Sequence, residues 1–132
     1  MSLHAIIIDD ARSVRMILKK MMVELGFTVE EAEDGKKALE ILVQNGPADV
    51  ALVDWNMPVM NGFEFIQEVR KQSIYDEMKI MMVTTESELV RMIAALEAGA
   101  NEYVMKPFTK DIIVEKLTIM GLINNENASA AH

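Results

Sequence analysis

The sequence predicts an α/β fold in which helices cover both faces of a parallel five-stranded sheet. Five apolar, strand-like segments alternate with five helix-like segments along the chain. Two of the strand-like segments, residues 5–8 and 50–53, are continuous apolar runs, which is typical of strands buried on both faces. Because helices separate consecutive strands, each connection must cross the sheet, and the strands must run parallel.

The strands are located by apolar runs and by the turn residues that follow them. Residues 27–33 are more polar than the other strand-like segments, as expected of an edge strand, and Asp34-Gly35 is expected to form a turn after it. A short last strand is expected to end at Lys106-Pro107, where proline interrupts the pattern. The expected strands are 5–8, 27–33, 50–54, 79–84 and 101–105.

The helices are located by apolar spacing, caps and breakers. Six apolar residues between positions 14 and 25 fall on one helical face, and Gly26 ends that helix. Ser87 and Thr109 are expected to cap the fourth and fifth helices. The expected helices cover about 14–25, 36–44, 63–72, 87–98 and 109–120.

The composition describes one acidic globular domain. The chain has 132 residues, 51% of them hydrophobic and 26% charged, which suits a single core of ordinary domain size. No cysteine is present, which excludes disulfides, thiolate metal ligands and a cysteine nucleophile. The net charge of −8 opposes binding to a phosphate backbone, so we expect no nucleic-acid partner. Without a long apolar run or a signal-peptide pattern, we expect a cytoplasmic protein with no membrane insertion.

Polar side chains follow the inner strands at the point where each strand ends. They are Asp9 and Asp10, Asp54, Thr84 and Lys106. Because the carboxyl ends of parallel strands share one edge of a sheet, these groups are expected to meet. Three close carboxylates repel one another, and a hard cation such as Mg²⁺ relieves that repulsion. A carboxylate beside an ammonium and a hydroxyl suits acceptance of a phosphoryl group.

Each of these residues has an ordinary structural interpretation when taken alone. An acidic pair such as Asp9-Asp10 is often a helix N-cap, and Asp54 is equally consistent with a turn residue. Thr84 alone is most often an ordinary strand residue, and Lys106 alone is usually solvated. Their shared position at one edge of the predicted sheet favours a functional site.

The motifs at these strand ends resemble those of one family, the receiver domains of two-component response regulators, and most closely its CheY-like single-domain chemotaxis members. The resemblance covers residues 4–121 and implies a flavodoxin-like (βα)5 three-layer sandwich with strand order 2-1-3-4-5, an order already known for this family. Residues 122–132 are expected to form a flexible C-terminal tail. The matching motifs are 8–10, 54–58 with 61–62, 83–86, 98–100 and 103–108.

The resemblance implies a phosphoacceptor with a bound Mg²⁺ ion. Asp54 would accept the phosphoryl group. Asp10 would bind Mg²⁺ directly, Asp9 mainly through a water molecule, and Asn56 through its backbone carbonyl. Lys106 would pair with the phosphoryl oxygens, and Pro107 resembles the cis proline of the family.

The resemblance also implies a conformational switch. The Thr84 hydroxyl and the Thr85 backbone N–H would donate to the phosphoryl group, and Tyr103 would turn inward on activation. Asn56 and Glu86 resemble the variable positions that tune dephosphorylation. The switched surface would include the fourth helix, the fifth strand and the fifth helix, with Met92, Tyr103 and Lys116 as candidate partner contacts that are equally consistent with ordinary surface.

The expected partners are a histidine kinase as phosphodonor and a downstream target, with a flagellar motor switch component as one candidate. The chain is expected to act as a monomer and to catalyse only its own phosphotransfer and autodephosphorylation. An excised receiver from a larger regulator or hybrid kinase is an alternative. A Mg²⁺-dependent aspartyl-phosphate phosphohydrolase is disfavoured, because residues 9–13 lack the Asp-x-Asp-x-Thr spacing of such enzymes. A pseudo-receiver that only binds a partner is a third possibility, and the complete set of site residues disfavours it.

Overall fold

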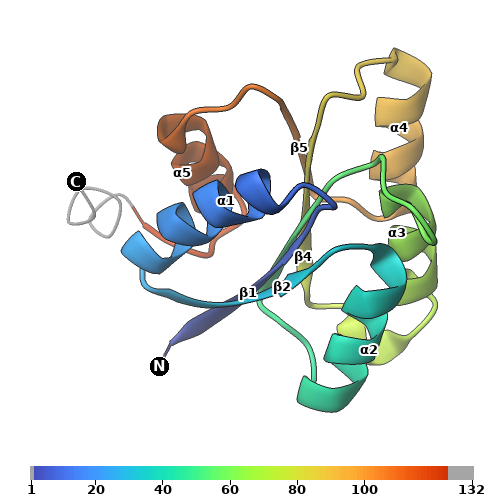
Figure 1. Cartoon of the computed structure of the whole chain (residues 1–132), viewed down its shortest axis with the longest axis horizontal. Coiled ribbons are helices and arrows are strands. Elements are labelled where there is room, and N and C mark those ends of the chain that lie inside the picture. The colour runs from blue at the N-terminus through green and yellow to red at the C-terminus, as the bar shows by residue number, and fades with distance from the viewer. Residues whose placement is uncertain (1, 125–132) are drawn as a thin grey trace.

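The computed structural model describes residues 2–124 and contains one five-stranded parallel sheet (Figure 1). The strand order is β2-β1-β3-β4-β5, so the predicted α/β architecture and strand order are confirmed. Residues 125–132, most of the tail expected from the sequence, lie outside the described residues. The strands are β1 (Leu3–Ile8), β2 (Phe27–Ala32), β3 (Val50–Val53), β4 (Lys79–Thr84) and β5 (Glu102–Met105).

The helices form a layer on each side of the sheet (Figure 1). On one side α1 and α5 pack on an apolar core that includes Leu18, Met22 and Ile113. On the other side α2, α3 and α4 cover a second core that includes Phe65 and Ile66. The helices are α1 (Arg12–Glu24), α2 (Gly35–Asn45), α3 (Gly62–Arg70), α4 (Leu89–Ala98) and α5 (Lys110–Ile119), with a short 3₁₀ helix η1 (Ser73–Tyr75).

The sheet register aligns the ends of the strands that carry the site. In the β1–β3 pair, Ile8 lies opposite Val53, so the residues that follow both strands emerge side by side. In the β4–β5 pair, Thr84 lies opposite Met105. All four residues of β3 and the last four of β1 are buried, as their apolar runs predict for inner strands. A well-packed sheet therefore fixes the positions of the polar residues at its edge.

Two of the predicted turn and cap positions are wrong. Asp34 is not a simple turn residue, because its carboxylate is the N-cap of α2 and accepts a hydrogen bond from the Lys37 backbone N–H at 2.8 Å. Ser87 does not cap α4, whose N-cap residue is Glu88 without a side-chain cap. The Glu88 N–H instead donates to the Glu86 carboxylate at 3.2 Å, so α4 begins later than expected.

Other local predictions are confirmed. The Thr109 hydroxyl accepts a hydrogen bond from the Ile112 N–H and caps α5. The Lys106–Pro107 peptide bond is cis. Gly62, the first residue of α3, lies so close to β3 that a Cβ there would collide with the Asp54 carbonyl oxygen. Glycine at this position is therefore required by close packing beside the site.

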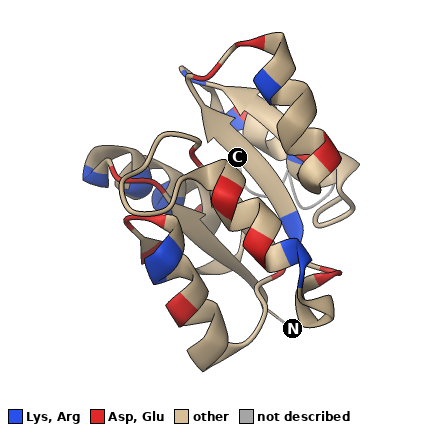
Figure 2. Cartoon of the chain, turned by 90° about the vertical axis from the view of Figure 1, so that its right-hand side faces the viewer, with Lys and Arg blue, Asp and Glu red and all other residues tan. Residues whose placement is uncertain are grey.

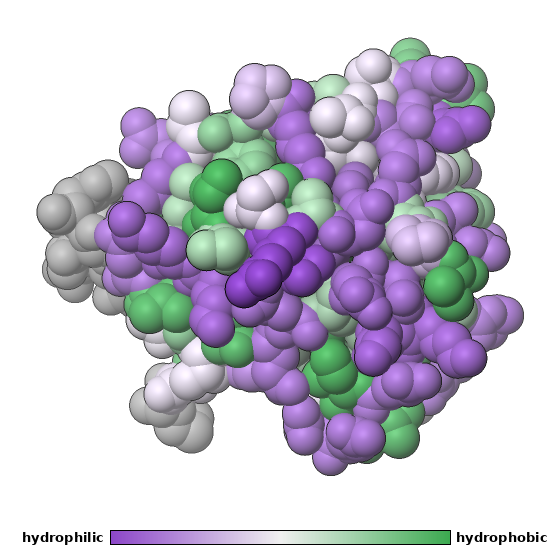
Figure 3. All heavy atoms as spheres, in the orientation of Figure 1, coloured by the Kyte–Doolittle hydropathy of each residue, from purple (hydrophilic) through white to green (hydrophobic). Residues whose placement is uncertain are grey.

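The surface is mixed in charge and mostly polar. Acidic and basic residues are interspersed over the helices (Figure 2). On the face shown in Figure 3, hydrophobic atoms are gathered in small, separate patches between hydrophilic ones. Among residues 2–124, no helix combines the length and apolar character needed to cross a membrane.

Candidate functional site

Three aspartates meet at the carboxyl edge of the sheet. Asp9 and Asp10 follow β1 and Asp54 follows β3, and the aligned ends of these strands bring their carboxylates together. One oxygen from each carboxylate lies within 4.8 Å of the others. Asp9 and Asp54 are buried, whereas Asp10 is exposed. The predicted acidic cluster is therefore present in the fold.

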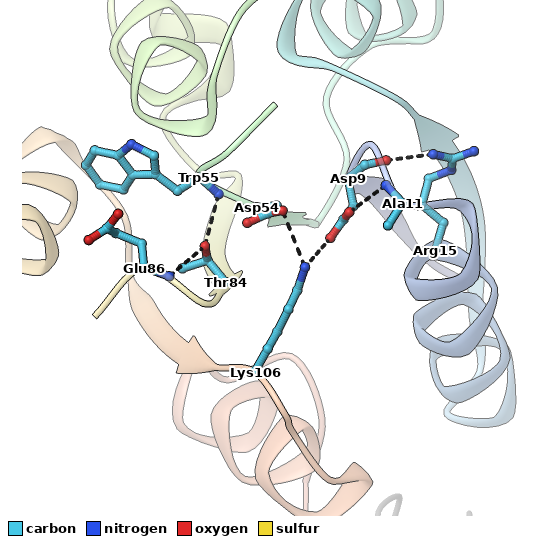
Figure 4. Close-up of polar contacts among 8 residues, drawn as sticks. All are labelled: Asp9, Ala11, Arg15, Asp54, Trp55, Thr84, Glu86 and Lys106. Carbon is cyan, nitrogen blue, oxygen red and sulfur yellow. Dashed lines mark hydrogen bonds and ion pairs between the residues drawn. The ribbon is translucent and has the colours of Figure 1, made fainter. Parts of the chain in front are cut away.

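Lys106 places its ammonium between two of these carboxylates (Figure 4). Its Nζ lies 2.8 Å from Asp9 Oδ2 and 3.3 Å from Asp54 Oδ2. Burial raises the pKa of Asp9, and the hydrogen bond from Lys106 opposes that rise. Burial by itself would lower the pKa of Lys106, but the attraction of Asp9 and Asp54 outweighs it and the pKa is raised. The ammonium is therefore charged at neutral pH and neutralises part of the cluster.

The carboxylate oxygens of Asp9 and Asp54 differ in the hydrogen-bond donors that they contact. Asp9 accepts hydrogen bonds from Lys106 and from the Ala11 backbone N–H at 2.9 Å. Asp54 Oδ1 is buried and is the one side-chain oxygen or nitrogen within residues 2–124 found both buried and without a hydrogen-bond partner. A buried acceptor without a donor is costly unless something else satisfies it. An all-oxygen donor set with such an acceptor fits a hard divalent cation.

Thr84, at the end of β4, borders the same site. Its side chain is fully buried, and its Oγ1 accepts hydrogen bonds from the Trp55 N–H at 3.4 Å and the Glu86 N–H at 3.2 Å (Figure 4). A hydroxyl that accepts two bonds still has its own proton to donate. Thr84 can therefore donate to an anion near Asp54. Thr85 and Asn56 are both exposed.

Tyr103 on β5 is connected to the site through the segment after β4. Its side chain is half-buried against the core, and its hydroxyl donates to the Glu86 carbonyl oxygen at 2.6 Å. Burial, together with the negative charges of Glu86 and Asp54, raises the pKa of Tyr103 to about 12. The phenol ring therefore packs against the core, and its hydroxyl is bonded to the segment that follows β4.

The other candidate partner contacts lie on α4 and α5. Met92 is half-buried on α4. Lys116 on α5 forms an ion pair with Glu102 on β5 at 3.0 Å, so it links two elements of the predicted partner surface. These two residues and Tyr103 come from the three elements expected to form that surface.

Two arginines near the site were not identified from the sequence. Arg15 Nη1 donates to the Asp9 backbone carbonyl at 2.6 Å, and its Nε pairs with Glu31 at 3.2 Å. The Arg91 guanidinium lies over the ring of Trp55, with its Cζ 5.8 Å from the ring centroid. The one sequence signal for the Arg15 contact was its short spacing from the end of the strand, because the first turn of a helix that follows a strand lies close to that strand. Nothing in the sequence indicates the contact of Arg91.

Comparison with known proteins identifies the family. The response regulator receiver domain family matches residues 5–118, and the chain belongs to it. The chain is 41% identical over 126 residues to the chemotaxis protein CheY homolog of Campylobacter jejuni, covering 94% of this chain and 97% of that protein. It is also 41% identical over 116 residues to chemotaxis protein CheY1 of Helicobacter pylori, covering 87% of this chain and 94% of that protein.

A solved structure gives the same result. The chemotaxis protein CheY4 of Vibrio cholerae superposes with a TM-score of 0.84 at 33% identity, covering 91% of this chain and 99% of that one. The predictions of a flavodoxin-like receiver fold and of a CheY-like response regulator are thus confirmed. Receiver domains of this family are signalling modules of two-component systems rather than conventional enzymes.

Proposed function

We propose that Asp54 accepts a phosphoryl group from a histidine kinase, with Mg²⁺ bound at the acidic cluster, and that this event changes a surface that binds a target protein in chemotaxis. The observation that carries the proposal is the state of Asp54. One of its oxygens is buried without a hydrogen-bond partner, and the other lies 3.3 Å from the Lys106 ammonium. The chemotaxis role is supported by the similarity to the Campylobacter and Helicobacter proteins.

Each residue of the cluster has a role in this transfer. The Asp54 carboxylate attacks phosphorus, and the bond from phosphorus to the donor nitrogen breaks. Asp10, Asp9 through water, and the Asn56 carbonyl would hold Mg²⁺, which supplies positive charge against the phosphoryl oxygens. Lys106 supplies a second positive charge at a fixed position. Phosphoryl transfer needs little beyond such positioning and charge neutralisation.

The hydroxyl of Thr84 and the backbone N–H of Thr85 would donate to the remaining phosphoryl oxygens. Thr84 Oγ1 accepts from the Glu86 N–H, and the Glu86 carbonyl accepts from Tyr103. A displacement of Thr84 toward the phosphoryl group is therefore transmitted to Glu86 and Tyr103 by direct hydrogen bonds. This chain of contacts supports a switch at α4, β5 and α5, where Met92, Tyr103 and Lys116 are the proposed target contacts.

Asn56 and Glu86 would tune dephosphorylation, and catalysis would extend only to the chain's own phosphotransfer and autodephosphorylation. We propose that the receiver unit spans residues 4–121 and acts as a cytoplasmic monomer. A flagellar motor switch component is the proposed target class. An excised receiver of a larger regulator would use the same site with a different output.

Trp55 provides the test, because the residue is 8% exposed and its backbone adjoins Asp54. Beryllofluoride, which mimics the phosphoryl group, should change Trp55 fluorescence saturably in the presence of Mg²⁺. The Asp54→Asn variant should show no such change, while Asp111→Asn, at an exposed aspartate of α5, should respond like the wild type. A folded wild-type protein without any response would contradict the proposal. Repeated turnover of small phosphate esters would favour the phosphohydrolase alternative instead.

A further inference from the structure

Glu86 has two different sets of contacts. Its backbone belongs to the site, because its N–H donates to Thr84 Oγ1 at 3.2 Å and its carbonyl accepts from the Tyr103 hydroxyl at 2.6 Å. Its side chain is 13% exposed, so its carboxylate is largely enclosed by neighbouring groups. The direction of that carboxylate determines whether its charge acts at Asp54.

Both oxygens of the Glu86 carboxylate contact donors at the start of α4. Oε2 accepts from Arg91 Nη1 at 3.1 Å, and Oε1 accepts from the Glu88 backbone N–H at 3.2 Å. In Figure 4 the Glu86 side chain lies on the Trp55 side of the site, well away from Lys106. The carboxylate is therefore held beside the phosphoacceptor but turned toward α4.

Arg91 is the residue best placed to hold it there. It is the one lysine or arginine in α4, and its side chain is 48% exposed. Its guanidinium lies over the Trp55 ring, where the electron-rich face of the ring attracts the cation. Trp55 itself stacks on Phe63, with ring centroids 5.3 Å apart. A fixed aromatic surface thus orients Arg91, and Arg91 orients Glu86.

We propose that Arg91 is a positioning residue that restrains the Glu86 carboxylate on the α4 side and thereby prolongs the phosphorylated state. The inference rests on the proposed function of Asp54. Once released, the carboxylate can turn toward the site, since the bond from the Glu86 backbone N–H to Thr84 Oγ1 keeps the Glu86 backbone beside it. There it would act as a base for the attacking water.

Glu86 would assist hydrolysis of the phosphorylated Asp54 side chain. A water oxygen bonds to phosphorus, and the bond between phosphorus and the Asp54 oxygen breaks. The electron pair of that bond returns to Asp54 as a carboxylate. The water proton passes to Glu86, and inorganic phosphate leaves.

A double-mutant cycle tests the coupling. Proteins phosphorylated by a small acyl phosphate with Mg²⁺ are separated from the donor, and loss of the phosphoryl group is followed. Arg91→Ala should speed this loss about two- to fivefold, the factor by which breaking a half-exposed ion pair shifts a population. The same substitution should have no effect in the Glu86→Gln background. Arg91→Lys keeps the positive charge and should restore a rate near that of the wild type.

Further measurements separate an effect on the position of Glu86 from general destabilisation. Lys71→Ala removes another surface ion pair, 2.9 Å to Glu68 on α3, and should leave the rate unchanged. Without phosphate or Mg²⁺, Arg91→Ala should shift the Trp55 emission, since it removes the cation above the ring. Thermal melts should show that all variants are folded.

The outcomes distinguish a failure of the role of Arg91 from a failure of the role of Asp54. An unchanged rate in Arg91→Ala, or an equal acceleration with and without Glu86→Gln, overturns the role of Arg91 while leaving the phosphoacceptor intact. If the folded wild type takes up no phosphoryl group at all, the proposed function of Asp54 fails, and the inference about Arg91 fails with it.

Discussion

Helices α3 and α4 cover the same face of the sheet and contact each other, but they are held in different ways (Figure 1). Helix α3 begins with a complete capping box, in which Asn61 and Glu64 bond each other's backbone N–H. Helix α4 begins without a side-chain cap, and one of its residues, Ala95, is buried. The buried residues of α3 are Gly62, Phe65, Ile66 and Val69, and large exposed apolar residues of α4 are Leu89, Val90, Ile93 and Leu96.

The two helices are joined where α4 ends. Arg70, at the end of α3, donates through Nε and Nη2 to the Gly99 carbonyl at 3.1 and 3.0 Å. The same guanidinium donates to the carbonyls of Tyr75 and Met78 at 2.8 Å. The end of α4 is therefore joined directly to α3, while its beginning is joined to the segment after β4 by the contacts of the Glu86 carboxylate with Glu88 and Arg91. The buried face of α3 thus packs beside the phosphoacceptor loop, whereas the start of α4 depends on the side-chain contacts of Glu86 and Arg91.

The largest expected effect comes from a comparison in which one large apolar side chain of each helix is truncated. Phe65→Ala in α3 removes a fully buried ring and should lower the free energy of unfolding by about 3–5 kcal/mol. Leu96→Ala in α4 affects a side chain that is 45% exposed and should change it by about 0.5 kcal/mol or less. Urea unfolding of both variants measures the difference. Similar losses in the two variants would contradict the contrast between the helices.

The next effect concerns the contact between α3 and the phosphoacceptor loop. Gly62→Ala places a Cβ against the Asp54 carbonyl, so the loop must shift, at a cost of about 1–3 kcal/mol. The fluorescence response of Trp55 to beryllofluoride should weaken as well, because Asp54 moves with its carbonyl.

Gly26→Ala is the control for this substitution. At Gly26 the added Cβ meets nothing within 4 Å, but φ is +97°, so a cost of about 1–2 kcal/mol arises from the backbone alone. The beryllofluoride response should remain in that variant. Loss of the response in both variants would show that general destabilisation, not displacement of the loop, is responsible.

The positions of the main site residues could be predicted from the sequence. Asp9, Asp10, Asp54 and Lys106 were located correctly at one edge of the sheet, because apolar runs define strand ends and parallel strands align them. These are local patterns combined with one topological rule. The family resemblance then supplied their proposed roles.

Contacts between distant side chains could not be predicted in this way. Arg91 over Trp55 and Arg15 on the Asp9 carbonyl depend on how helices settle against the sheet, which no local spacing encodes. Ser87 was predicted as a cap because serine favours that position, but Glu88 is the N-cap residue and its backbone N–H is bonded to the Glu86 carboxylate. At the start of α4, tertiary contacts thus outweigh local preference.

Removing the cap of α3 and adding a cap to α4 tests whether capping explains part of the difference in how firmly the two helices are held. Asn61→Ala removes the side chain that caps α3 and should cost about 1 kcal/mol. Glu88→Ser supplies α4 with a capping hydroxyl and should stabilise the protein by about 0.5–1 kcal/mol. Thermal melts measure both changes. Glu97→Ser, the same substitution near the end of α4, is the control and should give no gain, so equal gains at both positions would exclude capping as the cause.

The smallest effect concerns Tyr103, which ties β5 to the segment before α4. Its folded pKa of about 12 lies above the ordinary value of 10.0, so the protonated phenol stabilises the fold fully below pH 10, and this stabilisation is lost as the pH rises toward 12. Unfolding by urea at pH 8 and pH 11 should show the wild type losing about 0.5 kcal/mol more than Tyr103→Phe, after allowance for solvent screening. An identical pH dependence in wild type and Tyr103→Phe would show that burial and the charges of Glu86 and Asp54 do not favour the protonated phenol in the folded protein.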